Sequence, residues 1–159
     1  MMLNRHLDVL RRIVIRLRGR PVDWVVTGSL GVALQGVPVA VHDIDIQTDR
    51  DGAYEIERCF ADYVAKPVRF SESEHIRSHF GALEIDGIEV EVMGDLQKRL
   101  DDGGWGAPVD VECHRHWVEV NDIRVPVLSL DYEYRAYLAL GRTDRAERLR
   151  TWLRGRDGS

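Results

Sequence analysis

The chain reads VVTGSL at residues 25–30 and VHDIDI at residues 41–46, and these two stretches decide how it folds. In the first, an apolar run ends at Gly28-Ser29, which is typical of a buried strand that turns into a helix. In the second, Asp43 and Asp45 are two residues apart, so a strand would point both carboxylates to one face. Paired carboxylates can chelate a divalent cation, and the free N–H groups where a helix begins can bind phosphate.

The length and composition are those of a soluble globular protein. The 159 residues suffice for one domain with a sizeable core, and contents of 44% hydrophobic and 31% charged residues are ordinary. The sequence has no apolar run near the roughly 20 residues that span a bilayer, and no secretory signal. The two cysteines, Cys59 and Cys113, provide no disulfide framework. We therefore expect one cytoplasmic domain over residues 1–159, without membrane contact.

The net charge of −5 is unevenly distributed along the chain. Residues 1–20 carry +5, residues 21–128 carry −12 and residues 129–159 carry +2. An acidic middle between two arginine-rich ends argues against a broad nucleic-acid-binding surface, although it is compatible with a local one.

Hydrophobic periodicity and turn residues predict the secondary structure. Apolar residues recur at steps of three and four from Leu3 to Leu17, which predicts an N-terminal helix over 3–18. Asp86-Gly87 between two alternating apolar runs is a strong hairpin signal. We expect strands at 22–27, 39–48, 64–70, 80–86, 88–93 and within 117–128; helices at 30–34, 53–63, 95–100, 130–140 and 142–153; a turn at 49–52; and loops at 71–77 and 101–108. This order predicts an α+β fold, with a mixed sheet flanked by helices.

A third carboxylate is expected on the second arm of the hairpin. Apolar residues alternate along residues 88–92, so Glu89 and Glu91 share the opposite, polar face. Two-metal sites that act on phosphates bring carboxylates together from neighbouring strands. Glu91 is our preferred partner for Asp43 and Asp45, and Glu89, about 7 Å away along the strand, is the rival.

The ordered set of Gly28-Ser29, Asp43-Ile44-Asp45 and Glu91 resembles the signature of the polymerase-β-type nucleotidyltransferase superfamily. The later residues 127–131 and 140–144 look like the C-terminal helices of its abortive-infection-toxin branch, which is related to small antibiotic nucleotidyltransferases. The resemblance covers nearly all of the chain. It implies a nucleotidyltransferase-like domain with a catalytic core at 22–100 and C-terminal strands and helices at 117–154.

The resemblance implies that a nucleoside monophosphate is transferred from an NTP to an acceptor, with release of pyrophosphate. Asp43, Asp45 and Glu91 would be the catalytic residues and would hold two Mg²⁺ or Mn²⁺ ions. Gly28-Ser29 would bind the triphosphate. The acceptor is open between a small molecule, a protein and tRNA, and both a homodimer through the end helices and a partner protein are compatible with the sequence.

Other contacts to the nucleotide are less defined by the sequence. Lys66 and Arg69 on the strand expected at 64–70 are candidates to meet the triphosphate. The toxin branch commonly has a lysine where this chain has Tyr137, and Arg135 and Arg142 are the candidates to replace it. A second hypothesis follows: a nucleotide-binding or regulatory module with weak or no turnover, such as a component of a toxin–antitoxin pair.

Overall fold

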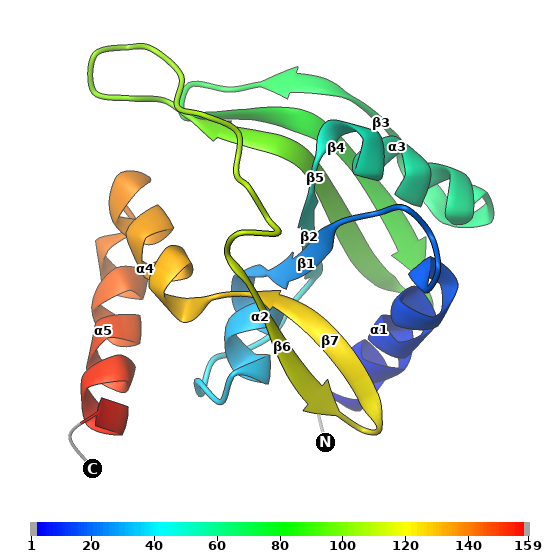
Figure 1. Ribbon diagram of the computed structural model, residues 1–159, viewed down its shortest axis with the longest axis horizontal. Coiled ribbons are helices and arrows are strands. Elements are labelled where there is room, and N and C mark those ends of the chain that lie inside the picture. Colours follow the sequence, from blue (N-terminus) through cyan, green and yellow to red (C-terminus); the bar gives the residue numbers. More distant parts are fainter. Residues whose placement is uncertain (1–2, 158–159) are drawn as a thin grey trace.

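The computed structural model describes residues 3–157, which form one seven-stranded sheet and five α-helices (Figure 1). The order of strands in the sheet is β3-β4-β5-β2-β1-β7-β6. In chain order the elements are α1 (Asn4–Leu17), β1 (Trp24–Thr27), α2 (Gly28–Leu34), β2 (Ile44–Thr48), α3 (Arg50–Cys59), the 3₁₀ turn η1 (Ala61–Tyr63), β3 (Val64–Glu72), β4 (Ile76–Ile85), β5 (Ile88–Lys98), β6 (Arg115–Val120), β7 (Ile123–Leu128), α4 (Leu130–Ala139) and α5 (Thr143–Asp157).

The stretch VVTGSL folds as predicted, because β1 passes directly into α2 at Gly28. Strand β1 pairs antiparallel with β2 on one side and parallel with β7 on the other. Strand β2 in turn runs parallel to β5. Strands from early and late parts of the chain therefore meet at the centre of one mixed sheet, and the predicted α+β fold is confirmed.

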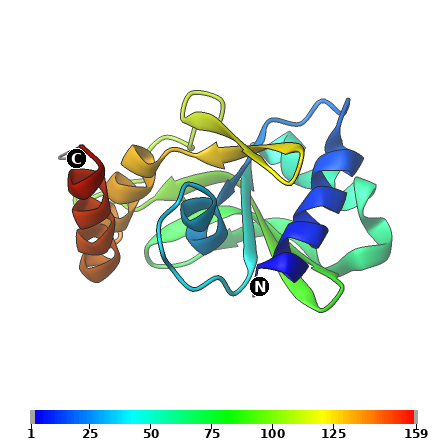
Figure 2. The same cartoon turned by 90° about the horizontal axis from the view of Figure 1, so that it is seen from below.

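The central strands have one apolar face and one polar face. Val26, Ile46 and Val92 are aligned across β1, β2 and β5, and all three are buried. They share the main hydrophobic core with apolar side chains of α1 and α3. Because strand side chains alternate, Asp45 and Glu91 belong to the opposite face. Figures 1 and 2 both place α1 and α3 on one side of the sheet and α4 and α5 on the other.

Two hairpins form, the first of them at the predicted Asp86-Gly87 turn. Asp86 and Gly87 have φ of 52° and 80°, as a two-residue turn of the primed type between β4 and β5 requires. Asn121 and Asp122, with φ of 47° and 66°, connect β6 and β7 in the same way. The first turn sets the register of β5, and therefore the face to which each of its side chains points.

Some predicted element boundaries are wrong. The strand expected over 39–48 begins only at Ile44, so Asp43 lies just before β2 and not within it. The turn expected at 49–52 is instead the start of α3, because the Asp49 side chain accepts the N–H of Gly52 as an N-cap. The helix predicted to reach residue 63 ends at Cys59, and β3 and β4 extend into the loop expected at 71–77.

The helix predicted over 95–100 is also wrong, because β5 continues to Lys98. Asp95 has a φ of 51°, and the pairing with β4 shifts at this point by one extra residue, which is a β-bulge. The bulge interrupts the alternation along the strand. Consequently Leu96 and Lys98 line the same cavity as Met93, on the polar side of the sheet.

The C-terminal helices begin close to their predicted positions. Ser129 caps α4, because its hydroxyl accepts the N–H of Tyr132 at 3.2 Å. Leu149 on α5 is buried in a small separate core with Val32 and Val37, and this core packs α5 against the region of α2. Within residues 3–157, no helix is both long and apolar enough to cross a membrane.

The cap of α3 gives a test of this architecture. Replacing Asp49 by alanine removes the acceptor of the 2.7 Å bond from the N–H of Gly52, so we expect the free energy of unfolding to fall by about 1 kcal/mol. Urea denaturation measures this change. Asp49→Asn keeps a side-chain oxygen and should stay close to wild type; equal stability of the alanine variant and wild type would contradict the assignment of the cap.

Candidate active site

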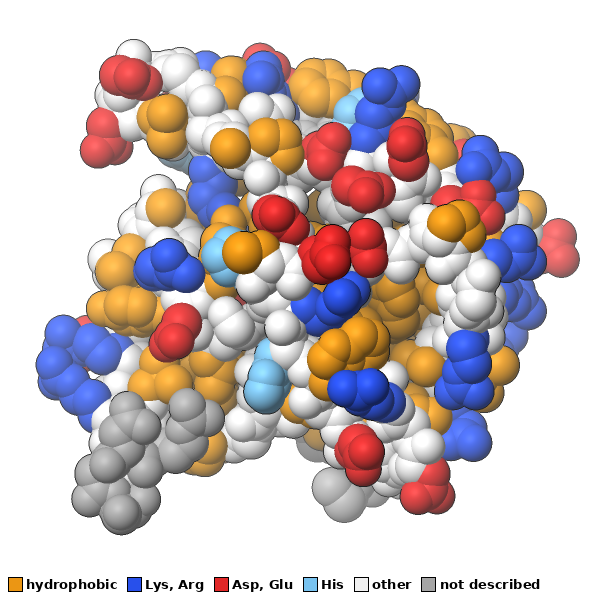
Figure 3. All heavy atoms as spheres, viewed as in Figure 1, with side chains coloured by type: hydrophobic (Ala, Val, Ile, Leu, Met, Phe, Trp, Pro, Cys, Tyr) orange, Lys and Arg blue, Asp and Glu red, His pale blue; other side chains and the backbone are white. Residues whose placement is uncertain are grey.

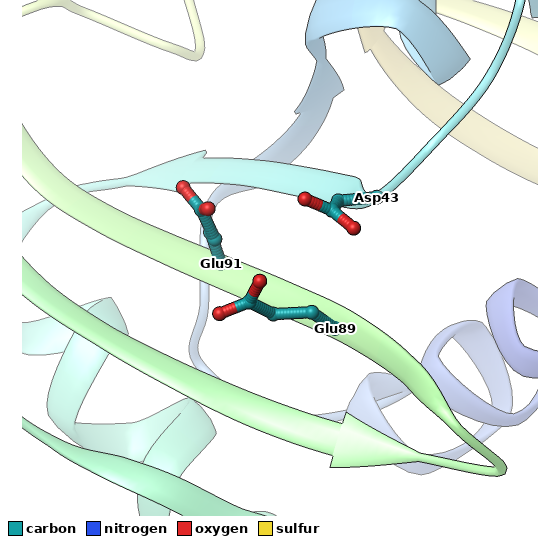
Figure 4. Close-up of side chains that lie close together, drawn as sticks. All are labelled: Asp43, Glu89 and Glu91. Atoms are coloured by element: carbon teal, nitrogen blue, oxygen red, sulfur yellow. The ribbon is translucent and has the colours of Figure 1, made fainter.

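The register of the central strands places the predicted carboxylates together. Asp45 on β2 lies directly beside Glu91 on β5 and beside Thr27 on β1. Asp43, Glu89 and Glu91 each offer a carboxylate oxygen, and these oxygens all lie within 4.8 Å of one another. Figure 4 shows the Asp43 carboxylate at the start of β2 facing those of Glu89 and Glu91 on β5. A group of this kind, made only of carboxylate oxygens, has the ligand chemistry that Mg²⁺ and Mn²⁺ prefer.

Asp45 belongs to the same site but points toward the turn between β1 and α2. Its Oδ2 lies so close to Gly28 that a Cβ at residue 28 would clash with it. Gly28 also has a φ of 69°, in the left-handed region that favours glycine. Glycine at residue 28 is thus required by two geometric constraints: a positive φ and the close approach of the Asp45 carboxylate.

Two carboxylates of the site have raised pKa values. Burial raises the pKa of Asp45 to about 7, and the charges of Glu91, Asp43 and Glu89 add to this effect while Arg142 opposes it. Burial and the neighbouring acids raise the pKa of Glu91 in the same direction. Several carboxylates crowded in this way repel one another, and a bound divalent cation would relieve the repulsion.

A cavity of about 440 Å³ opens beside these residues, within the size range of small-molecule sites. Gly28, Ser29, Asp43 and Asp45 all line it. Its apolar lining includes Val32, Val37, Val39, Ala40, Ile76, Met93, Leu96, Ala136, Leu140 and Leu149. Its cationic lining consists of Lys98, Arg142, Arg145 and Arg148. The predicted phosphate-binding turn and two of the predicted metal ligands therefore share one cavity with several positive charges.

The other predicted phosphate contacts lie elsewhere. Lys66 and Arg69 are exposed on β3, in register with Ala82 and Phe80 of β4, and both lie outside the described lining of the cavity. Lys66 is nevertheless near enough to Glu91 to oppose the rise of its pKa. Arg142, considered from the sequence as a replacement for a missing lysine, does line the cavity, and so does Tyr137.

Two further residues of the site were not predicted. Lys98 was assigned to a helix, because nothing in the local sequence marks the bulge at Asp95 that places it in the cavity. Glu133 lies in the first turn of α4, where acidic residues are common because they interact favourably with the helix dipole, so its presence there does not indicate a functional role. Neither position carries a recognisable motif.

Glu133 joins the C-terminal helices to the predicted triphosphate turn. It is only 4% exposed, and its carboxylate accepts the hydroxyl of Thr27 at 2.9 Å and the N–H of Gly28 at 3.0 Å. Burial raises its pKa to about 7 despite these two hydrogen bonds, and the charge of Asp45 adds to the effect while Lys98 opposes it. One of the backbone N–H groups expected to face phosphate is thus bound to a side chain of α4.

Comparison with known proteins identifies the family. The model of the aminoglycoside-2''-adenylyltransferase family matches residues 9–151, which is most of the chain. The chain belongs to this family. It is therefore a transferase of the nucleotidyltransferase type, and the resemblance to the antibiotic nucleotidyltransferases of the polymerase-β superfamily is confirmed. No curated protein sequence is significantly similar to the chain.

Solved structures of other proteins are similar to this chain. A candidate nucleotidyltransferase of Thermotoga maritima, TM1012, is 61% identical, with a TM-score of 0.84 over 95% of this chain and 94% of that one. ANT(2'')-Ia in complex with adenylyl-2''-tobramycin is 12% identical, with a TM-score of 0.60 over 94% and 90% of the two chains. Lincomycin-bound LnuA, a lincosamide antibiotic adenylyltransferase, is 14% identical, with a TM-score of 0.54 over 82% of each chain. The last two share the fold of this chain.

Glu133 should make the stability of the protein depend on pH. Its pKa is raised from 4.5 to about 7 by folding, so between these values the folded state holds a proton that the unfolded state has lost. The free energy of unfolding should therefore fall as pH rises through this range and level off above it. Relative to Glu133→Gln, which does not titrate, the loss should reach about 3 kcal/mol.

Urea denaturation of both proteins between about pH 5 and pH 8 measures this difference. Asp45, Lys98 and Tyr137, the titratable groups that interact with Glu133, are the same in both proteins, so the difference between the two profiles reports the titration of Glu133 together with its electrostatic coupling to Asp45. Glutamine can accept the N–H of Gly28 and donate to the Thr27 hydroxyl, which preserves both hydrogen bonds. Parallel stability profiles would show that Glu133 does not titrate with the raised pKa.

Proposed function

We propose that the chain transfers a nucleoside monophosphate from an NTP, with ATP as the first candidate, to a small hydroxylated acceptor, and that it requires Mg²⁺ or Mn²⁺. One observation carries this proposal. Asp45 and Glu91 are in register on adjacent strands, Asp43 lies within reach of Glu91, and Gly28-Ser29 lines the same cavity as both aspartates. ATP is proposed because the family and the related structures are adenylyltransferases.

The carboxylates would hold the metal ions. Asp43 and Asp45 are the proposed ligands on the cavity side, and Glu91 completes the set from β5. Bound ions would neutralise charge on the phosphates and on the departing pyrophosphate. The fit rests on the chemistry of the ligand atoms, which are carboxylate oxygens from two adjacent strands.

Glu91 also has a proposed role in activating the acceptor. The acceptor O–H gives its proton to the Glu91 carboxylate, and the acceptor oxygen forms a bond to the α-phosphorus. The bond between that phosphorus and the oxygen bridging to the β-phosphate breaks, and pyrophosphate leaves with the electron pair. This role is assigned to Glu91 because it is in register with Asp45, on the strand beside it.

The positive side chains of the cavity would bind the triphosphate together with Gly28-Ser29. Arg142 and Lys98 line the cavity and already act electrostatically on Asp45 and Glu133, respectively. Lys66 and Arg69 are exposed on β3, outside the described lining of the cavity, so they would contact the triphosphate only where it extends out of the cavity. Arginine can bind phosphate with two parallel hydrogen bonds, which makes Arg142 the first choice for mutation.

The acceptor is proposed to be a small molecule that approaches from the acidic side of the site. Acidic side chains gather on the face seen in Figure 3, over the region of β2 and β5, and Glu89 and Glu91 lie outside the described lining of the cavity. An acceptor carrying amino groups as well as hydroxyls would complement this charge. Lincomycin and tobramycin, the antibiotics in the related structures, supply the first compounds to test.

A nucleotide-binding module with little turnover is the second candidate. The observation in its favour is the hydrogen bond from the N–H of Gly28 to Glu133, since a triphosphate cannot use that N–H while Glu133 holds it. Calorimetry that shows metal-dependent binding of NTP, combined with an absence of product for every acceptor, would favour this alternative over the enzyme.

Asp45→Asn should lower metal-dependent transfer from α-labelled ATP by about 100-fold or more, because it removes a charged ligand at the centre of the site. The assay measures labelled product and pyrophosphate with aminoglycoside and lincosamide acceptors. Asp51→Asn, an exposed acid in the first turn of α3, serves as the matched control and should retain full activity. Equal activity of the Asp45 variant and wild type would refute the metal site.

The two glutamates of β5 can be ranked by the same assay. Glu91→Gln should lower turnover by about 10- to 100-fold more than Glu89→Gln, because Glu91 is in register with Asp45 and Glu89 is one alternation farther along the strand. The reverse order would make Glu89 the third carboxylate. Thermal melting of both variants controls for changes in stability.

A further inference from the structure

A buried amide on the cavity floor has no role in the chemistry described above. Gln47 lies on β2, two residues beyond Asp45, and lines the same cavity. Its side chain is only 6% exposed. Its Oε1 is buried and has no hydrogen-bond partner within the part of the chain that the structure describes. A buried polar atom without a partner is destabilising, which points to a partner that arrives with a ligand.

The strand neighbours of Gln47 are apolar, although Lys98, which pairs in register with Ile76, lines the same cavity. Its register neighbours are Val25 on β1 and Met93 on β5. Ile76 and Leu96 line the same cavity, and Leu96 reaches it because of the bulge at Asp95. A single amide among aliphatic and thioether side chains suits a flat ring with hydrogen-bonding groups on its edge. The faces of such a ring would pack against the apolar side chains, and its edge would hydrogen-bond the amide.

The position of Gln47 relative to the carboxylates favours the nucleotide over the acceptor as its ligand. Asp43, Asp45 and Gln47 follow one another at alternate positions, so Gln47 lies about 7 Å beyond Asp45, away from Asp43. Glu89 and Glu91, where the acceptor is proposed to approach, lie outside the described lining of the cavity, whereas Gln47 lies within it. The part of the cavity that contains Gln47 can therefore accept the remainder of a nucleotide whose α-phosphorus is at Asp43 and Asp45.

We propose that Gln47, with Ile76, Met93 and Leu96, forms the subsite for the nucleobase of the NTP, and that its amide hydrogen-bonds the edge of the base. The amide presents both a donor and an acceptor, so it distinguishes bases by the pattern of groups on their edges. This inference rests on the proposed function, because it assumes that an NTP binds in this cavity.

The test compares Gln47→Leu with wild type in calorimetric titrations with Mn²⁺ and each of the four NTPs, and with inorganic triphosphate, which has no base. Leucine keeps the side chain's approximate size and removes the unpaired amide, so the melting temperature should equal or exceed that of wild type. We expect affinity for the preferred NTP to fall about 3- to 10-fold, with smaller changes for the other three. Affinity for inorganic triphosphate should stay unchanged.

Gln97→Leu is the matched control. Gln97 is a partly buried glutamine on β5 outside the described cavity lining; it accepts from Arg77 and donates to the carbonyl of Gly106. Its loss should leave the ranking of the four NTPs unchanged, even where stability falls.

Three results would overturn the inference while leaving the proposed function intact. They are equal NTP affinities of Gln47→Leu and wild type, an equal loss for the NTPs and for inorganic triphosphate, and a change confined to the KM of the acceptor. Failure of wild type to bind any NTP with Mn²⁺ would instead refute the proposed function, and the base subsite with it.

Discussion

The pairing of β2 between β1 and β5 is the constraint on which the rest of the site depends. This register brings Thr27, Asp45 and Glu91 into one row, and it directs Val26, Ile46 and Val92 into the core under α1 and α3. A slip of one residue would exchange the two faces, burying the carboxylates and exposing the valines. The hydrophobic core and the candidate site are thus specified by the same alternation, and a change of register would disrupt both.

The C-terminal helices add what the sheet cannot supply. Glu133 of α4 reaches the turn between β1 and α2 with two hydrogen bonds, and Arg142, between α4 and α5, acts on Asp45. Burying Glu133 is unfavourable for its charged form, as its raised pKa shows. The fold therefore tolerates an energetic cost to hold Gly28 against Asp45, which is the place where the proposed triphosphate and metals would meet.

Much of this site could be predicted from the sequence, and the physical reasons for the failures are specific. Strand alternation and the Asp86-Gly87 turn are local signals, so the shared polar face of Glu89 and Glu91 followed from them; the register that sets Glu91 beside Asp45 is long-range, and the sequence only favoured Glu91 over Glu89. The bulge at Asp95 could not be predicted from the local sequence. Residues 95–100 have a helix-forming composition, and only the pairing with β4 makes this segment a strand. Glu133 was missed for a similar reason, since its partners are more than 100 positions away in the sequence.

The opposing charges of the cavity explain why these distant elements belong to one site. Four acids, Asp43, Asp45, Glu89 and Glu91, lie at the junction of β2 and β5, and four cationic side chains line the cavity next to them. Burial, with repulsion from the neighbouring acids, raises the pKa values of Asp45 and Glu91, and a divalent cation would stabilise their charged forms. The cationic lining would be neutralised by phosphate. The proposed metal–nucleotide complex carries both charges at once, so it would neutralise the acids and the cationic side chains in a single binding event, whereas either component alone would neutralise one of the two groups.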